Sequence, residues 1–481
     1  MKLEQYLQQH FGYEGFRAGQ REVIEQLVAG HDVVALLPTG MGKSLCYQLP
    51  GYLFQKPVLI VSPLLSLMQD QVDQLKQFGE KRVVALNSFL TQEEKQYALH
   101  FLHEYRFIFT SPEMLTQPQV RERLRGMELS LIVADEAHCI SQWGFDFRPD
   151  YLRIAELIDT PNRPPILALS ATATQSVLRD IEHYLTMNSP YCYIHSVDRA
   201  NIALVKKSFA QKEQKLTWIY EHVQRTAGPG IIYTQSRARA EAISLYLVQQ
   251  QIAAAAYHAG KDLHDRQFIQ QQFLAGELEW IVATNAFGMG VHKGNIRQVI
   301  HESMPGNMAN YMQEIGRAGR DGEPAIAYLL YADTDEQLAK FIVAEDLPRT
   351  VHIERYAYLR GHNEPPQAML RNGEISETQF RVLHYWMQRE SAEEVKSRFA
   401  QIEMKKYAAV QEMLALIESE ECIRKQVLYY FGQQLTETIE NCCSNCGFEE
   451  QAITQKRQLK EKQQLFSSWQ NRLQQLLIKE K

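Results

Sequence analysis

The sequence lacks any long hydrophobic run. Among its 481 residues, no apolar stretch approaches the roughly 18 residues that a membrane span requires. The first residues, MKLEQY, also lack the apolar core of a secretion signal. These two absences predict a cytoplasmic protein that has no membrane partner.

An excess of positive charge is lacking as well, because 51 Lys and Arg residues are outnumbered by 57 Asp and Glu residues. This balance argues against a protein that coats nucleic acid through basic charge alone, but it permits binding in a local groove. Cysteine is sparse, with seven in the chain. Cys46, Cys139 and Cys192 are scattered and are predicted to be buried. The other four, Cys422, Cys442, Cys443 and Cys446, lie close together near the C-terminus, which in a reducing compartment favours a metal site over disulfides.

A glycine-rich segment, PTGMGKS at residues 38–44, follows an apolar run at residues 33–37. This order predicts a strand, a tight loop and a helix, with backbone N–H groups directed at phosphate oxygens. Lys43 is placed to reach the β and γ phosphates, and the Ser44 hydroxyl to bind Mg²⁺. Leu37 stands where the full phosphate-loop pattern has glycine, so only part of the pattern is matched. The nucleotide contacts predicted in this loop are Thr39, Gly40, Met41, Gly42, Lys43 and Ser44.

Residues 3–30 are predicted to form two helices joined by a turn that carries an aromatic ring, a cation and an amide. We expect Tyr13 and Arg17 to stack on a purine while Gln20 hydrogen-bonds to its edge. An ordinary surface turn is the alternative interpretation.

Short apolar segments alternate with helical ones through the chain. The alternation predicts an α/β fold, with parallel sheets covered by helices and functional groups at the carboxyl ends of the strands. One such end carries the tetrad DEAH at residues 135–138. Asp135 is predicted to hold Mg²⁺, and Glu136 to orient and deprotonate the attacking water. The alternative is a solvated acidic strand end.

The loop that follows, SQWGFDFRPDY at residues 141–151, is rich in aromatic side chains. Aromatic rings and arginine beside an ATP site suit stacking on unpaired bases. A small apolar cluster is the alternative. The predicted DNA contacts are Gln142, Trp143, Phe147 and Arg148.

The strand–helix order resumes after a polar segment at residues 190–212, which we interpret as a linker. The second half reaches the sequence QEIGRAGRDG at residues 313–322. Gln313, Arg317 and Arg320 are predicted to share a helix face, where the arginines clamp the charge that develops on the γ-phosphate.

Together these segments resemble the RecQ family of superfamily 2 DNA helicases over most of residues 1–330. The motifs that carry the resemblance are FRAGQ (16–20), PTGMGKS (38–44), DEAH (135–138), QWGFDFRP (142–149), SAT (170–172), AFGMG (286–290) and QEIGRAGR (313–320).

The resemblance implies two RecA-like domains with ATP in the cleft between them. It also implies unwinding of duplex DNA in the three-prime to five-prime direction, in repair, recombination or replication restart. Arg320 is the expected arginine finger. The chain departs from the family at Phe145, where histidine is usual, and at His292, where aspartate is usual. We expect the first departure to alter how DNA contact is signalled to hydrolysis and the second to weaken coupling between the domains.

The last third is predicted to be helical, with either a helical hairpin or a helix-turn-helix at residues 376–389 and 393–405. Cys422, Cys443 and Cys446 then resemble the ligands of the RecQ zinc-binding subdomain. The family has a further cysteine where this chain has Glu449, so the fourth ligand is either Cys442 or Glu449, and a metal-free site is the alternative.

The expected division of the chain is residues 1–195 and 196–340 for the two RecA-like domains, 341–450 for the helical and zinc-binding region, and 451–481 for a helical tail. This tail is too short for the winged-helix and further helical domains of longer RecQ proteins. The expected partners are single-stranded and duplex DNA and a single-strand-binding protein, and we expect a monomer. Two other functions compete: an ATP-dependent RNA helicase, and a scaffold that uses ATP as a switch without unwinding.

Overall fold

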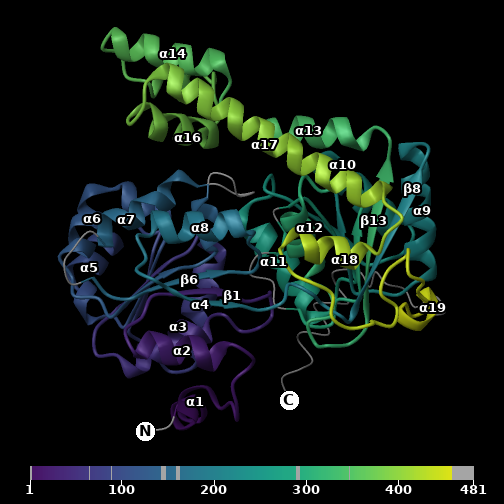
Figure 1. Ribbon diagram of the computed structural model, residues 1–481, viewed down its shortest axis with the longest axis horizontal. Coiled ribbons are helices and arrows are strands. Elements are labelled where there is room, and N and C mark those ends of the chain that lie inside the picture. The colour runs from purple at the N-terminus through teal and green to yellow at the C-terminus, as the bar shows by residue number, and fades with distance from the viewer. Residues whose placement is uncertain are drawn as a thin grey trace, which may run out of the picture.

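The computed structural model describes residues 3–63, 65–87, 89–141, 148–158, 163–285, 287–288, 293–345 and 347–457. Two parallel sheets with their covering helices form two lobes that lie side by side, and a helical arm extends over both of them (Figure 1). None of the described helices is both long enough and apolar enough to cross a membrane.

The first lobe contains a seven-stranded parallel sheet in the order β3-β4-β2-β5-β6-β1-β7. Its inner strands are continuous apolar runs because helices bury both faces, and two separate clusters of buried side chains occupy those faces. The strands are β1 (Val33–Leu36), β2 (Val58–Val61), β3 (Val83–Leu86), β4 (Phe107–Thr110), β5 (Leu131–Ala134), β6 (Ile166–Ser170) and β7 (Tyr191–Ile194). The helices are α1 (Leu3–Phe11), α2 (Gln20–Val28), α3 (Leu45–Leu53), α4 (Leu65–Gln77), α5 (Gln92–His100), α6 (Pro118–Arg125), α7 (Ile154–Ile158) and α8 (Gln175–Tyr184).

The second lobe repeats this design with six parallel strands in the order β10-β11-β9-β12-β13-β8. Buried side chains again form one cluster on each face of the sheet. The strands are β8 (Ile202–Phe209), β9 (Gly230–Tyr233), β10 (Ala254–Tyr257), β11 (Trp280–Ala283), β12 (Gln298–His301) and β13 (Ala325–Ala332), and the helices are α9 (Lys212–Arg225), α10 (Arg237–Gln249), α11 (Leu263–Ala275) and α12 (Met308–Ile315). The predicted α/β class with two parallel sheets is therefore confirmed.

The interpretation of residues 190–212 as a linker is wrong for most of the segment. Most of this segment forms two edge strands: β7 pairs with β1 of the first sheet, and β8 pairs with β13 of the second. Edge strands have a partner on one side only, so they tolerate polar residues that hide them in a sequence. The chain passes from one sheet to the other in residues 195–201, which we call the crossover.

The helical arm is built on α17 (Ala392–Glu418). At one end α17 packs with α14 (Thr350–Gly361) and α16 (Glu377–Met387), and from there it runs across the second lobe (Figure 1). A hairpin of α16 and α17 is present, and its second helix continues to Glu418 rather than ending at Lys405. After the cysteines at 442–446, α19 (Glu450–Ile453) covers only the first residues of the helical tail predicted at 451–481. Residues 454–457 are not helical, and residues 458–481 lie outside the described part. The helices of this region are α13 (Asp335–Glu345), α14 (Thr350–Gly361), α15 (Ala368–Arg371), α16 (Glu377–Met387), α17, α18 (Ile423–Tyr430) and α19 (Glu450–Ile453).

Candidate active site and cysteine cluster

The loop at residues 38–44 connects β1 to α3, as predicted. Its glycines Gly40 and Gly42 adopt φ angles of 93° and 72°, which a residue with a Cβ atom rarely adopts. Two side chains from the segment before α2 and its first turn hold this loop: Arg17 donates to the carbonyl of Gly40, and Nε2 of Gln20 donates to the carbonyls of Met41 (2.9 Å) and Gly42 (3.0 Å). Gln20 is thus engaged with the loop itself, and its contact with an adenine edge stays a prediction.

A cavity of about 340 Å³ lies beside the loop, a volume suited to a nucleotide. Both lobes line it. The predicted nucleotide contacts line the cavity except for Met41, which packs against the core of the first lobe, and the ring of Tyr13 is 52% exposed there. The lining residues that the sequence predicted are Tyr13, Arg17, Gln20, Thr39, Gly40, Gly42, Lys43, Ser44, Asp135, Glu136, Gln313, Arg317 and Arg320.

Asp135 follows β5 directly and is almost fully buried. One of its carboxylate oxygens accepts from the Ser62 hydroxyl at 3.2 Å and the other from the N–H of Glu136 at 3.0 Å. Burial, together with the negative charge of Glu136, raises the pKa of Asp135 to about 6. A divalent cation would stabilise the ionised carboxylate, so Asp135 fits an Mg²⁺ ligand, with the Ser44 hydroxyl as a second oxygen on the same cavity.

Glu136 has a left-handed backbone conformation, with φ 48° and ψ 47°, which is strained for a residue with a side chain. Its Oε1 lies 3.4 Å from Nζ of Lys43, and its Oε2 lies 3.5 Å from Nδ1 of His138. Burial opposes ionisation of Glu136, but the positive charges of Lys43 and His138 outweigh it and lower its pKa. Oε2 accepts no hydrogen bond from the described residues, so a water molecule could bind there.

The second lobe contributes three predicted residues, but not from one helix face. Gln313 is on α12, which ends at Ile315, and the arginines Arg317 and Arg320 lie in the turn after it. We call residues 316–320 the arginine turn. The helix ends at Ile315, before either arginine, and Gly319 has a φ of 53°, so the chain turns between Arg317 and Arg320. The prediction of a shared helix face is therefore wrong, although all three side chains reach the cavity.

The arginine turn contacts the phosphate loop of the first lobe. The Thr39 hydroxyl donates to the carbonyl of Gly316 at 3.0 Å, and a Cβ atom on Gly40 would lie 3.4 Å from Cγ of Arg320. Burial and the positive charges of Arg317 and Arg199 lower the pKa of Arg320 to about 9. Crowded, desolvated guanidinium groups beside a phosphate loop form a site that favours a polyphosphate.

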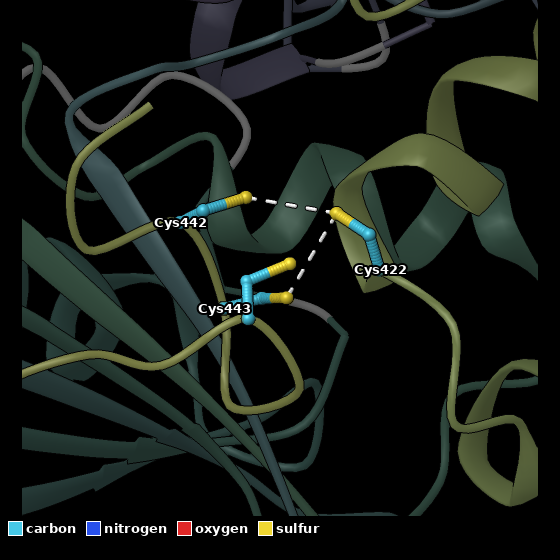
Figure 2. A group of neighbouring side chains, drawn as sticks. Cys422, Cys442 and Cys443 are labelled. Atoms are coloured by element: carbon cyan, nitrogen blue, oxygen red, sulfur yellow. Dashed lines mark hydrogen bonds between the residues drawn. The ribbon is translucent and has the colours of Figure 1, made fainter. Parts of the chain in front are cut away.

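Four cysteines converge near the edge of the second sheet, and Figure 2 labels three of them, Cys422, Cys442 and Cys443. The sulfur atoms of Cys422, Cys442, Cys443 and Cys446 all lie within 4.8 Å of one another. The Sγ–Sγ distances from Cys422 are 3.7 Å to Cys442 and 3.9 Å to Cys443. A tetrahedral zinc site with Zn–S bonds of about 2.3 Å has S–S edges of about 3.8 Å, so the four thiols fit zinc.

For the fourth ligand, the geometry favours Cys442 over Glu449. Glu449 is not in the cluster, and its N–H donates to the side chain of Asn441 at 2.8 Å. Cys442 and Cys443 are both held beside β8: the N–H of Leu204 donates to the carbonyl of Cys442 at 3.2 Å, and Cys443 forms a bridge with Leu204. Of the three scattered cysteines, two are buried as predicted, but Cys192 is exposed because it lies on the edge strand β7.

Of the predicted DNA contacts, Gln142, Trp143 and Phe147 lie outside the described residues, as do the departures at Phe145 and His292. Arg148 is the one predicted DNA contact that lies within the described residues. Its Nη1 donates to the carbonyl of Pro63 at 3.0 Å and lies 3.7 Å from Glu113, which also lies 3.5 Å from Arg381 of the helical arm. This end of the aromatic-rich loop therefore lies where the first lobe meets the arm.

Sequence reasoning missed three residues that support the site. Tyr151 donates to the carbonyl of Asp135 at 2.7 Å, and Ser62 donates to its carboxylate. Ser62 follows β2, so its position at a strand end was a usable signal. Arg199, which contacts the arginine turn, gave no signal because it lies in the segment interpreted as a linker.

These features define a two-lobed, helicase-type ATPase, and comparison with known proteins agrees. Residues 17–181 match the DEAD/DEAH box helicase family, and residues 211–322 match the helicase conserved C-terminal domain. The fold is similar to that of the DUF1998 helicase MrfA bound to DNA, with a TM-score of 0.59 and 20% identity over 71% of this chain and 52% of that one. It is also similar to S. cerevisiae Dbp5 bound to RNA and ADP BeF3, with a TM-score of 0.57 and 16% identity over 71% of this chain and 90% of that one.

The helical region narrows the assignment, because residues 379–447 match the RecQ zinc-binding family. The chain is 41% identical to the probable ATP-dependent DNA helicase RecS of Bacillus subtilis, over 98% of this chain and 97% of that protein. It is 36% identical to the ATP-dependent DNA helicase RecQ of Pasteurella multocida, over 90% of this chain but only 60% of that protein's length. The chain belongs to the RecQ family of ATP-dependent DNA helicases.

Proposed function

We propose that this protein uses Mg-ATP hydrolysis to unwind duplex DNA in the three-prime to five-prime direction. The observation that carries the proposal is the contact between lobes at the nucleotide cavity, where Arg320 packs on Gly40 and Thr39 bonds to Gly316. A nucleotide bound there contacts groups of both lobes, so loss of its γ-phosphate on hydrolysis removes contacts that join the lobes. Such opening and closing moves a strand bound across them.

Each group has a role that follows from its chemistry. Lys43 binds the β and γ phosphates, and Glu136 accepts a proton from the attacking water through its uncommitted oxygen. Ser44 and Asp135 would hold Mg²⁺, which supplies positive charge against the phosphates when bound. Arg317 and Arg320, with Gln313 beside them, stabilise the charge that develops on the γ-phosphoryl group. Tyr13, Arg17 and Gln20 contact the base.

DNA contact is assigned to Gln142, Trp143, Phe147 and Arg148, and zinc to the four clustered cysteines. The names of the RecS and RecQ relatives, which are DNA helicases, support DNA over RNA. We also propose the division into domains at residues 195, 340 and 450, a monomeric state, a cytoplasmic location, a single-strand-binding protein as partner, and a role in repair, recombination or replication restart.

Strand displacement on tailed duplexes tests the proposal. We expect displacement with a three-prime tail but not with a five-prime tail, only with hydrolysable ATP and Mg²⁺, and none by the Lys43→Ala variant. Displacement from a five-prime tail would overturn the direction. DNA-stimulated hydrolysis without displacement would favour the scaffold, and equal or greater stimulation by RNA would favour the RNA helicase.

A further inference from the structure

The crossover between the two sheets contacts the arginine turn through Arg199. Its guanidinium donates to three carbonyls of that turn: Gly316 at 3.2 Å, Ala318 at 3.2 Å and Gly319 at 2.7 Å. These carbonyls flank Arg317 and immediately precede Arg320 in the chain. Arg199 does not line the nucleotide cavity, so its link to the nucleotide runs through the backbone of the turn.

A second crossover residue holds the same turn. The side-chain amide of Asn201 donates to the carbonyls of Gly319 and Glu323, each at 2.8 Å. A Cβ atom on Gly319 would lie 2.4 Å from this amide nitrogen, so the turn has no room to shift toward the crossover. The side chains of Arg199 and Asn201 donate five hydrogen bonds to described residues, and four of these end within the arginine turn.

The other side of the crossover is held by the region that carries the cysteines. Arg424 on α18 is only 2% exposed, and it donates to the Asp198 carboxylate, to the carbonyl of Arg199 (3.0 Å) and to the carbonyl of Cys442 (3.3 Å). One buried guanidinium thus joins the cysteine cluster to the residue that holds the arginine turn.

We infer that Arg199 is a positioning residue for ATP hydrolysis, which orients Arg317 and Arg320 through the arginine turn, and that Arg424 fixes Arg199 in register with the cysteine cluster. This inference rests on the proposed function. It identifies the crossover as the element through which the cysteine cluster supports hydrolysis in a distant cavity.

The test compares Arg199→Ala, Arg199→Lys and a control, Arg225→Ala, whose exposed side chain pairs only with Glu221 among the described residues. Misplacement of a catalytic group by about 1 Å costs up to about 100-fold, so we expect Arg199→Ala to lower kcat by about 10- to 100-fold with KM for ATP changed by less than about twofold. Lysine keeps a charged donor for the carbonyls and should recover part of this loss. The control should leave both constants unchanged.

Ligand affinity separates positioning from general damage. Arg199→Ala should weaken binding of ADP with aluminium fluoride, a transition-state analogue, by the same factor as kcat, and leave binding of ADP alone unchanged. Zinc content and DNA affinity should equal those of the wild type. Equal losses for both ligands, or a kcat within about twofold of wild type, would overturn the inference.

A double-mutant cycle tests the link to the cysteine cluster. Arg424→Lys keeps the buried charge but not the planar fork, and it should lower kcat in the same manner. If the two arginines act in series, the double variant with Arg199→Ala loses no more than Arg199→Ala alone, whereas additive losses would overturn the series. A wild type that hydrolyses no ATP would instead refute the proposed function, so the two failures are distinguishable.

Discussion

The two lobes share a parallel-sheet design but hold their functional groups differently. In the first lobe, Asp135 and Glu136 directly follow β5, and Lys43 lies near the end of the loop that joins β1 to α3, so the sheet fixes all three. In the second lobe, Arg317 and Arg320 lie in a turn after a helix, where the crossover and the phosphate loop hold them. Under the proposed function, we therefore expect the first lobe to supply most of the nucleotide binding, whereas the second contributes its charges only where the lobes meet.

Under the proposed function, this difference predicts that one lobe binds the nucleotide and the other stabilises the transition state. A group that acts only in the transition state raises kcat without tightening substrate binding. If the lobes separate between turnovers, Arg317 and Arg320 contact the nucleotide only when the lobes close, and we expect them to act in this way. Mutations can therefore divide the two lobes by their effects on KM and on kcat.

Arg320→Ala is expected to have the largest effect. Loss of an arginine finger costs about 10³-fold or more in turnover, and we expect KM for ATP to change by less than about threefold because the first lobe still binds the nucleotide. Steady-state hydrolysis at saturating DNA measures both constants. If KM rises as much as kcat falls, the second lobe contributes to ground-state binding. The proposed division of roles between the two lobes would then be wrong.

Glu136→Gln tests the first lobe. The amide keeps the size of the side chain and a possible contact with Lys43 but cannot accept a proton, so we expect about 10²- to 10⁴-fold slower hydrolysis. Binding of a fluorescent ATP analogue and the melting temperature should stay near wild type. Near-normal turnover would show that Glu136 is not the base and would leave Asp135 as the carboxylate to examine.

Cys446→Ser tests whether the cysteine cluster beside the second lobe binds zinc and stabilises the fold. Loss of one of four sulfur ligands should abolish stoichiometric zinc and lower the melting temperature by about 5–10 °C, because metal binding contributes directly to folding. Elemental analysis and thermal unfolding measure the two effects, with Cys192→Ser as the control because that thiol lies outside the cluster. A metal-free wild type of normal stability would remove zinc from this account.

The first lobe was more predictable from the sequence than the second, for a physical reason. A phosphate loop or an acidic tetrad directly after an apolar strand is a local pattern, and local patterns fix where Lys43 and Asp135 lie. The position of Arg317 depends instead on the turn after α12, which the hydrogen bonds of Arg199 hold and which no short sequence pattern marks. Both predicted arginines line the cavity, but the local structure predicted for them was wrong.

Long-range pairing explains the remaining errors. The edge strands β7 and β8 are partly polar because one side of each lacks a strand partner, so the segment between the lobes gave no strand signal. Cys442 could not be chosen over Glu449, because the convergence of four sulfurs depends on a bridge between Cys443 and Leu204, far apart in the chain. Neither the edge-strand pairing nor the position of Cys442 can be predicted from a short segment of sequence.

Thr39→Val is expected to have the smallest effect and probes the junction of the lobes most directly. Valine keeps the shape of the side chain but removes the hydroxyl that donates to Gly316 across the cleft. One neutral hydrogen bond contributes about 1 kcal/mol, so kcat should fall by about fivefold if that bond forms only when the lobes close. Thr39→Ser keeps the hydroxyl and should stay within about twofold of wild type. If Thr39→Val raises KM and leaves kcat unchanged, the hydroxyl serves nucleotide binding in the first lobe, and the arginine turn is held in place by the crossover alone.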